Sequence, residues 1–345
     1  MRTKRVLFLA TSKKTRGGIT AVLKAYEQYP FWKDYQVCWL ETHIDRGMFS
    51  KLYYAFVALL KYLLCVWHYD LIHIHTSELP SVKRKYIFFK IAKLLRKKVI
   101  IHLHIGNQLD EKVGNRLYQS MFDGADAIIV LSQSIRLKLE QLFGIKDKVS
   151  VLYNPSPIVS NVQYTDENKE IIFAGTLNQN KGYSVLIQAF ARVASEFPDW
   201  KLVIAGNGEI EAAKQLSLKL GVSNRISFLG WVRDKAKDTL FRRASIFCLT
   251  SYAEGFPMAV LDAWSYGLPV ISTPVGGLPD ILKDGENVLF FKAGDVEGLA
   301  DRLRFLMLDR NLRLRLSDSS LALSKNQFSA NSINSQIDNL YKKLL

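Results

Sequence analysis

The sequence has few cysteines and no long apolar or repetitive run. Its three cysteines, Cys38, Cys65 and Cys248, are widely separated and have no metal-ligand spacing. They therefore exclude a disulfide framework and a cysteine-bound zinc ion. Each lies in an apolar stretch, so we expect buried free thiols in a reducing compartment. Long polar tracts are absent and 48% of the residues are hydrophobic, which excludes a disordered chain.

The apolar segments are too short for targeting or for crossing a membrane. The run from Val6 to Ala10 is shorter than the core of a signal peptide and continues into Lys13 and Lys14, so we expect a first β-strand there. The segment 52–67 is interrupted by Lys61 and falls short of the ~20 residues of a spanning helix. We interpret it as a buried amphipathic helix.

Acidic residues are scarce in the first half of the chain. Residues 1–165 contain 25 Lys and Arg but 12 Asp and Glu, whereas the remaining residues contain 22 Lys and Arg and 20 Asp and Glu. Basic residues cluster at 83–85 and between Lys90 and Lys98. This asymmetry indicates an anionic partner, either membrane lipid, a phosphorylated acceptor or nucleic acid; a solvated basic face is the structural alternative.

Short apolar runs alternate with helical patterns along the chain. The runs are continuous, as in parallel strands covered on both faces. Strands are predicted at 6–10, 36–40, 71–75, 99–104, 127–131 and 149–153, and again at 171–174, 200–206, 226–229, 246–250, 269–272 and 288–291. Helices are clearest at 52–67, 83–95 and 116–123. Alternation of this kind predicts βαβ units and parallel sheets.

The length of 345 residues and a polar, proline-containing stretch at 155–169 predict two domains. We assign residues 1–160 to an N-terminal acceptor-binding domain and 161–330 to a C-terminal nucleotide-sugar-binding domain. A helical tail, 331–345, is long enough to cross back onto the first domain. The predicted fold is α/β, with two Rossmann-like doubly wound parallel-sheet domains facing one another across a cleft.

Ligands in open α/β sheets bind beyond the carboxyl ends of the strands, so the residues there are the candidates. In the first half, the loop Arg16-Gly17-Gly18 lets the backbone approach a phosphate closely. His75 and His104 each end a strand, and His104 could donate to a sugar hydroxyl. The paired histidines at 73, 75, 102 and 104 also suggest a zinc site. We disfavour this interpretation because no acidic residue is spaced nearby as a further ligand.

In the second half, Gly175 ends a strand and Lys181-Gly182 begins a helix. A lysine there can neutralise a diphosphate, and its charge would otherwise oppose the helix dipole. Glu254 lies just before another helix, and Asp262 follows eight residues later. The N–H groups of residues 255–258 would face a diphosphate, between a sugar at the first carboxylate and a ribose at the second.

These motifs together resemble glycosyltransferase family 4, whose members have two Rossmann-like domains in the GT-B arrangement. The resemblance rests on Gly17-Gly18, on His104 before Gly106, on Gly175 with Lys181-Gly182, and on the Glu254 motif in EGFP. The sequences TPVGGLPDIL and DGENVLFF follow in the family's order. The match is specific over roughly residues 171–295 and looser before residue 160.

The resemblance implies a role for each matching position. His104, Glu254 and Lys181 would be catalytic, through contact with the transferred sugar, its hydroxyls and the phosphate oxygens respectively. Asp262 would bind the ribose. The donor-binding set is Gly17, Gly18, Gly175, Thr176, Lys181, Glu254, Gly255, Phe256, Pro257, Met258 and Asp262, and the acceptor-side set is Arg16, His75 and Asn107.

Three positions depart from the family pattern. Thr176 stands where the family usually has arginine, which weakens stabilisation of the leaving group unless Arg16 or another residue substitutes. Asp262 and Asp280 each replace a common glutamate. A catalytically inactive member of the family therefore stays open as an alternative.

The family's implied reaction is retaining transfer from a nucleotide diphosphate sugar, without a cofactor or a metal. The leaving diphosphate would help to deprotonate the acceptor. The acceptor is expected to be a lipid-linked saccharide at the inner face of the cell membrane, because the basic half suits an anionic surface. A nucleotide-sugar 2-epimerase of the same fold and a basic nucleic-acid-binding protein are the alternatives, the latter opposed by the nearly neutral second half.

Overall fold

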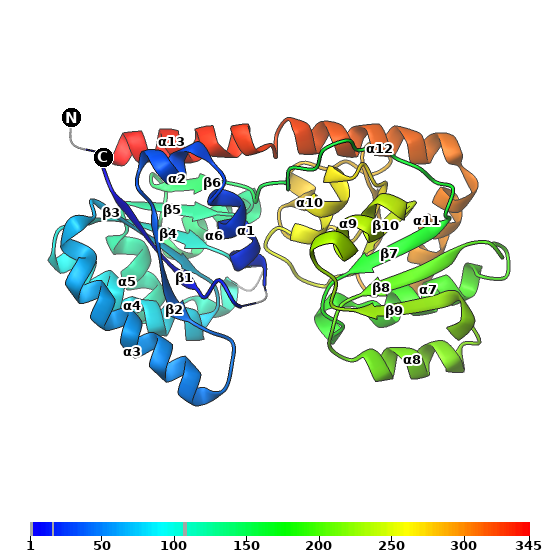
Figure 1. The fold of residues 1–345 in the computed structure, drawn as a ribbon, viewed down its shortest axis with the longest axis horizontal. Helices are drawn as coiled ribbons and strands as arrows, with labels where there is room; N and C mark the ends of the chain where they lie inside the picture. The colour runs from blue at the N-terminus through cyan, green and yellow to red at the C-terminus, as the bar shows by residue number, and fades with distance from the viewer. Residues whose placement is uncertain (1–2, 16, 106–108) are drawn as a thin grey trace. The chain divides into compact units, whose positions relative to one another are not determined.

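The chain divides into two compact α/β units in a computed structural model that describes residues 3–15, 17–105 and 109–345. The first unit comprises residues 1–155 together with 330–345, and the second comprises residues 156–329. Figure 1 shows the course of the chain through both, and each unit is described by itself below.

The first unit is built on a six-stranded parallel sheet with the order β2-β1-β3-β4-β5-β6. All of its strands were predicted from the sequence, and their parallel pairing is confirmed. The bounds are β1 Val6–Thr11, β2 Cys38–His43, β3 Leu71–Thr76, β4 Lys98–Leu103, β5 Ala127–Val130 and β6 Val149–Val151. The middle strands are buried on both faces, which explains their uninterrupted apolar sequences.

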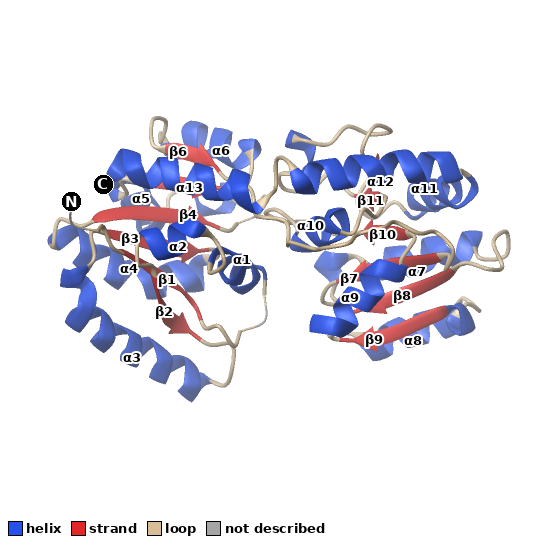
Figure 2. Cartoon of the chain, turned by 45° about the horizontal axis from the view of Figure 1, so that its top comes forward, coloured by secondary structure: helices blue, strands red, loops and turns tan. Residues whose placement is uncertain are grey.

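Helices cover both faces of this sheet (Figure 2). They are α1 Gly18–Tyr26, α2 Pro30–Asp34, α3 Met48–Cys65, α4 Leu79–Leu94, α5 Arg116–Gly124, α6 Gln133–Phe143 and α13 Ala330–Leu344, with short 3₁₀ turns at Val66–His68 and Asp110–Lys112. Helix α13 packs on α2: Tyr35 Oη donates to Asp338 Oδ1 at 2.8 Å. The C-terminal segment therefore completes the unit that the N-terminus begins.

The interpretation of segment 52–67 as a buried helix is wrong. It does form a helix, α3, but within it only Ala58 and Tyr62 are buried, whereas most of its large apolar side chains face solvent. The helix contacts β2 through its buried side, and the Tyr62 hydroxyl donates to Phe88 O of α4 at 3.0 Å. Helical periodicity indicated that the segment has a face to bury, but α3 is apolar on both sides.

The second unit repeats the architecture with the order β12-β11-β10-β7-β8-β9. Its strands are β7 Glu170–Ala174, β8 Lys201–Ala205, β9 Ile226–Gly230, β10 Ile246–Leu249, β11 Val270–Ser272 and β12 Leu289–Phe290. Its helices are α7 Tyr183–Val193, α8 Ile210–Lys219, α9 Asp234–Arg243, α10 Met258–Ser265, α11 Val296–Leu308 and α12 Arg310–Lys325, with 3₁₀ turns at Gln179–Lys181, Ser223–Arg225 and Leu278–Asp280. The two sheets confirm the predicted fold class of paired doubly wound parallel sheets.

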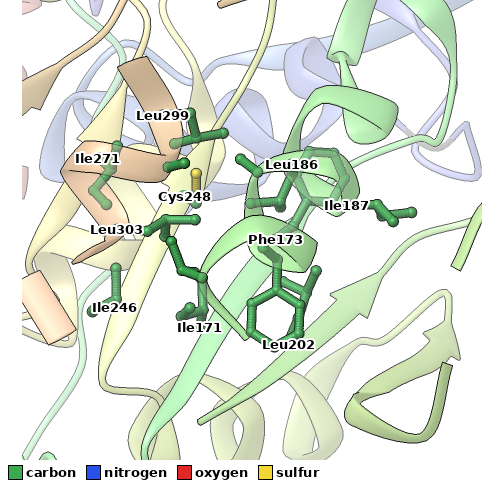
Figure 3. Packing of buried hydrophobic residues seen from close by; sticks show 14 of the residues in the cluster. Ile171, Phe173, Leu186, Ile187, Leu202, Ile246, Cys248, Ile271, Leu299 and Leu303 are labelled. Carbon is green, nitrogen blue, oxygen red and sulfur yellow. The ribbon is translucent and has the colours of Figure 1, made fainter. Parts of the chain in front are cut away.

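The core of the second unit lies between this sheet and the helices α7 and α11 (Figure 3). Phe173 of β7, Leu186 of α7 and Leu303 of α11 are fully buried there. Cys248 of β10 belongs to the same cluster, and burial raises the pKa of its thiol far above the usual range. Of the other two thiols Cys65 is half-buried and Cys38 is exposed, so the expectation of three buried thiols is wrong for Cys38.

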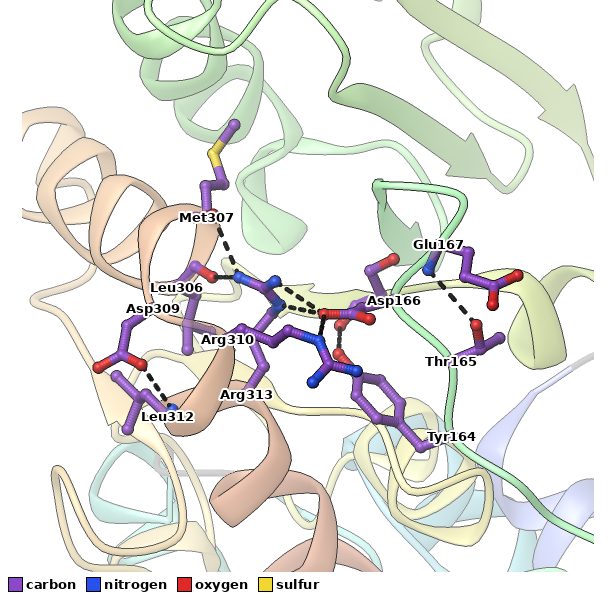
Figure 4. A network of polar contacts seen from close by, with 11 residues as sticks. Tyr164, Thr165, Asp166, Glu167, Leu306, Met307, Asp309, Arg310, Leu312 and Arg313 are labelled. Carbon is purple, nitrogen blue, oxygen red and sulfur yellow. Dashed lines mark hydrogen bonds and ion pairs between the residues drawn. The ribbon is translucent and has the colours of Figure 1, made fainter.

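The polar stretch predicted as a linker is tied to the second unit (Figure 4). The Arg313 guanidinium of α12 donates to Asp166 Oδ2 at 2.8 and 3.2 Å and also to Met307 O. Arg310 lies 3.4 Å from the same carboxylate oxygen. Because Arg313 and Asp166 are both largely buried, this shared ion pair fixes where the chain enters the second domain.

Candidate functional site

The strand order of the second sheet singles out one position for a ligand. The first strand, β7, lies between β10 and β8, so the chain runs outward in opposite directions on its two sides. Loops that leave the carboxyl ends of β7 and β10 therefore diverge at this switch point, where open α/β sheets bind their ligands. These loops contain residues 175–182 and 250–257, which carry the strongest sequence motifs.

The conformation of the loop after β7 depends on an asparagine cap and on a glycine with positive φ. The Asn178 side chain caps the 3₁₀ turn by accepting from Lys181 N at 2.9 Å. Gly182 follows with φ +61°, a backbone conformation that side chains other than glycine rarely adopt. A Cβ at this position would also run into Thr250 O, so the glycine lets the two loops approach each other.

Hydrogen bonds join this loop to the one after β10. Thr250 Oγ1 donates to Lys181 O at 2.7 Å, and Tyr252 N donates to Asn180 O at 2.8 Å. Asn180 Nδ2 donates in turn to Ala253 O at 3.1 Å. The backbone around the predicted phosphate-binding lysine is thus held against the backbone around the predicted sugar-binding glutamate.

The side chains of Lys181 and Glu254, which lie 73 residues apart in sequence, form an ion pair. Their Nζ and Oε1 atoms are 2.5 Å apart. The Glu254 side chain is 13% exposed and that of Lys181 26%, so the pair is shielded from bulk water on most sides yet stays accessible. The structure therefore brings together two of the three residues predicted to be catalytic.

The helix α10 begins directly behind this ion pair. Pro257 is its N-cap, and the first turn closes through Val260 N, which donates to Pro257 O at 3.1 Å. The N-terminus of the helix thus contributes N–H groups and partial positive charge next to Glu254. The side chain of Phe256 is buried against Trp264 and Phe328, so its backbone N–H, the group that the sequence analysis assigned to the diphosphate, is the part available for a donor.

Asp262 lies one turn further along α10 and is paired with a cation that the sequence analysis missed. Lys237 Nζ of α9 is 2.6 Å from Asp262 Oδ1. Burial raises the pKa of the Asp262 carboxyl, and the Lys237 ammonium opposes that rise. Nothing in the local sequence marks Lys237, because the pair depends on how α9 packs beside α10.

Glycines shape the ends of the neighbouring strands. A Cβ on Gly206 would meet Gly175 O, and Gly230 ends β9 with φ +65° beside Asn207. Gly276, with φ +57°, similarly allows close approach to Gly255 O. Thr176 is exposed at the end of β7. These loops present mainly backbone groups toward the carboxyl edge of the sheet.

In the first unit the predicted residues also lie at a switch point, here between β1 and β3. Gly17 is the N-cap of α1, and Gly18 is its first residue, at the carboxyl end of β1. Space around Gly17 is open, since a Cβ there would have no atom within 4 Å. The predicted residues Arg16, Gly106 and Asn107 lie outside the described residues.

The histidines at the ends of β3 and β4 form one stacked group on the face of the sheet beneath α13. His75 Nδ1 and His104 Nε2 are 3.0 Å apart, and His73 Nε2 and His102 Nδ1 are 3.3 Å apart. Tyr341 Oη of α13 lies 2.7 Å from His73 Nδ1. Burial lowers the pKa of His73 and of His104 to about 3, so both rings are neutral at physiological pH.

Ring nitrogens of His73, His75 and His102 lie within 4.8 Å of one another, so this group has the donors that a metal ion would need. Two features fit such an ion poorly. Nδ1 of both His75 and His102 already pairs with another ring, although Nε2 of each has no partner among the described residues, and Lys85 is buried beside the group with its ammonium donating to His75 O. Lys85 was predicted to lie on a basic surface, but burial lowers its pKa to about 7.

The two doubly wound parallel sheets define a class of two-domain α/β proteins, and comparison with known families assigns the chain within it. Residues 159–322 match the family model of glycosyl transferases group 1, and residues 35–156 match that of glycosyltransferase family 4. The chain belongs to this glycosyltransferase family. The resemblance stated from the motifs is thereby confirmed.

Curated relatives show the same assignment at low identity. An uncharacterized glycosyltransferase of Haemophilus influenzae is 27% identical over 64% of this chain, and the match spans 62% of that protein. An α-1,4-N-acetyl-D-galactosaminyltransferase of Campylobacter jejuni, whose name gives a diphosphate-undecaprenol-linked saccharide as its acceptor, is 26% identical over 66% of this chain and 63% of its own length. The chain thus aligns with somewhat less than two thirds of both relatives.

Solved structures agree on the fold. The structure of HepE from Anabaena in complex with UDP-glucose superimposes with a TM-score of 0.79 over 99% of this chain and all of that one, at 20% sequence identity. At this identity the likeness establishes the fold.

Proposed function

We propose that this protein is a retaining glycosyltransferase that transfers a sugar from a nucleotide diphosphate to an acceptor hydroxyl. The observation that carries the proposal is the Lys181–Glu254 pair at the switch point of the second sheet, in front of the N-terminus of α10. A cation, a carboxylate and a helix N-terminus at one point match the phosphates and hydroxyls of a sugar nucleotide.

Each group has a distinct role in holding the donor. The Lys181 ammonium and the first N–H groups of α10 bind diphosphate oxygens, while Glu254 accepts hydrogen bonds from hydroxyls of the transferred sugar. Asp262 accepts from the ribose deeper along the helix, where the Lys237 ammonium opposes the rise that burial causes in the pKa of its carboxyl. Lys181 and Glu254 neutralise each other in this structure, so neither charge is left unbalanced.

The same groups would supply the chemistry. As the bond between the anomeric carbon and the diphosphate breaks, negative charge grows on the leaving oxygen, and Lys181 and the α10 N-terminus stabilise it. The acceptor oxygen attacks from the face that the diphosphate leaves, and its proton passes to the diphosphate, which retains the anomeric configuration. This arrangement places the stabilising charge on the protein, so we expect activity without a divalent metal.

The acceptor we propose is a lipid-linked saccharide at the inner face of the cell membrane, in the synthesis of a surface polysaccharide. Residues 1–165 carry 25 basic and 12 acidic residues, and this excess suits an anionic membrane surface or a diphosphate linkage. The Campylobacter jejuni relative, whose name gives such an acceptor, supports the choice.

Transfer of a labelled sugar tests the proposal. Purified protein is incubated with individual labelled nucleotide sugars and an extract of lipid-linked saccharides, in buffer containing EDTA. Label should enter the lipid fraction with one nucleotide sugar, and the anomeric proton coupling of the product should match that of the donor. An inverted product would contradict retention, and loss of transfer in EDTA would contradict metal independence. Epimerised free sugar nucleotide, formed without acceptor, would indicate the epimerase instead.

A further inference from the structure

The outer side of α3 carries a continuous apolar surface. Its side chains recur every three or four residues, so they lie along one side of the helix. Phe49 is 90% exposed, Leu64 79% and Phe56 62%. We call this surface the α3 apolar face, made up of Phe49, Leu52, Phe56, Leu60, Leu64 and, in the adjoining turn, Trp67. An unbroken apolar stripe of this length marks an interaction site on a soluble domain.

The charged residues within α3 and along the outer side of α4 are all basic. Helix α3 contains no acidic residue, and Lys61 is exposed on it. Helix α4, which contacts α3, exposes an outer row in which Lys83 and Lys90 alternate with Ile87 and Leu94. The stripe is therefore bordered by ammonium groups, a combination that matches the acyl chains and anionic headgroups of a bilayer.

The two strands that α3 connects limit how the helix can contact a bilayer. The segment Met48–His68 has the length and composition of a membrane-spanning helix. It connects β2 to β3, however, and both strands pair with β1 in one sheet. Crossing the membrane would place these strands on opposite sides of it. Both ends of α3 thus stay on the same side, and the opposite face of the helix, with Ala58 and Tyr62, stays packed on the protein.

We propose that the α3 apolar face inserts into an anionic bilayer, with the helix axis parallel to the membrane plane, and holds the first unit on the membrane. The inference deepens the proposed function and rests on its membrane-linked acceptor. Apolar insertion provides most of the binding free energy, and Lys61, Lys83 and Lys90 add attraction to anionic headgroups. A second copy of the chain is a poorer occupant, because pairing two such faces would bring their lysines together.

Flotation with vesicles tests the inference. The full chain is mixed with phosphatidylcholine vesicles that contain or lack phosphatidylglycerol. We expect binding to the anionic vesicles that high salt weakens but does not abolish. The variant Phe49→Gln/Phe56→Gln/Leu64→Gln should lower the partition coefficient by at least about tenfold, since insertion scales with buried apolar area. The matched control, Leu218→Gln/Phe305→Gln/Leu308→Gln, removes three equally exposed apolar side chains from α8 and α11 and should bind as the wild type does.

The depth to which α3 inserts and the folding of the variants are measured on the same samples. Brominated acyl chains should quench fluorescence from Trp67, and Trp67→Phe should remove that component. The α3 variant should keep the wild-type melting temperature and its affinity for a nucleoside diphosphate. Equal partitioning of the α3 variant and the wild type would overturn the inference. So would a wild-type dimer that ignores vesicles and that the α3 variant converts to a monomer. A wild type that floats but binds no nucleotide would instead contradict the proposed function alone.

Discussion

Two charged pairs bring together residues that are remote in sequence, Lys181 with Glu254 and Lys237 with Asp262. The carboxylates lie on α10, in the case of Asp262, or on the loop before it, in the case of Glu254. Lys181 comes from the loop after β7 and Lys237 from α9. In both pairs the carboxylate is the less exposed partner, so the lysine is the group that a ligand reaches first. If the donor binds as proposed, donor binding and the contacts between these segments depend on the same side chains.

Replacement of Glu254 by Gln should preserve the fold and reduce transfer. The amide keeps the shape of the side chain but loses the charge that strengthens hydrogen bonds to donor hydroxyls, a loss of ~1.5–3 kcal/mol or about 13- to 160-fold in kcat/KM. Steady-state transfer assays measure this. The control is Glu211→Gln, which removes a carboxylate from a surface lysine pair on α8. Wild-type turnover by Glu254→Gln would show that this carboxylate does not hold the sugar.

Replacement of Lys181 by Ala should weaken the binding of a bare nucleoside diphosphate. Removing one charge-assisted contact costs about 1.5–3 kcal/mol, and Glu254, left without its cation, adds repulsion toward the phosphates. Titration calorimetry measures the affinity, with Lys169→Ala as a control that breaks the lysine pair with Asp199 away from the site. Adding Glu254→Gln to Lys181→Ala should restore part of the affinity. An unchanged dissociation constant in Lys181→Ala would place the diphosphate elsewhere.

At the scale of elements, each of the twelve strands in the described part of the chain was predictable as a short apolar run between polar or helical segments. The positions of Lys181 and Glu254 at strand ends followed from the same pattern. Two features of the structure could not be predicted from the sequence. Lys237 acquires its partner only through the packing of α9 beside α10. The exposure of α3 depends on which elements cover it, and its sequence would be equally apolar with a buried outer face.

The close approach of the loops after β7 and β10 can be tested through Gly182. Alanine there must adopt φ near +61° and would also collide with Thr250 O. Gly221 provides the control, because its φ of +70° is similar and a Cβ would meet no atom within 4 Å. Gly221→Ala should lower the free energy of unfolding by about 1–2 kcal/mol. Gly182→Ala should lower it by more and also weaken nucleotide binding.

Thermal unfolding and nucleotide calorimetry check both effects. Equal destabilisation by the two alanines, with nucleotide affinity intact, would mean that the loops can move apart at no cost to the site. Their contact would then be unimportant for binding the donor.

At the scale of the whole molecule, the histidine group should make stability depend on pH. The pKa of His73 is about 3 in the folded protein against 6.5 unfolded, and those of His75 and His102 are also lowered by burial. Between these values the unfolded chain binds more protons, so the free energy of unfolding falls as the pH drops below 6.5. Each such histidine contributes about 1.4 kcal/mol per pH unit.

Calorimetric unfolding of the full chain from pH 7 to pH 4.5 measures this dependence. His102→Gln removes one titrating ring, and it should reduce the slope by about one histidine's share, ~1.4 kcal/mol per pH unit, even if it lowers stability at pH 7. An unchanged slope would show that this ring binds protons as readily in the folded protein as in the unfolded chain.

The central claim is that the second unit binds a nucleotide diphosphate sugar through Lys181, Glu254 and Asp262. Its most direct test is thermal unfolding of the wild type and Lys181→Ala with a panel of nucleoside diphosphates and their sugars, in EDTA. Nucleotides with one particular base should stabilise the wild type, by about 2.7 kcal/mol when the ligand is at 100 times its dissociation constant. The variant should need a higher ligand concentration for the same shift in melting temperature. A wild type that no nucleotide in the panel stabilises, or a variant that responds as the wild type does, would contradict the account.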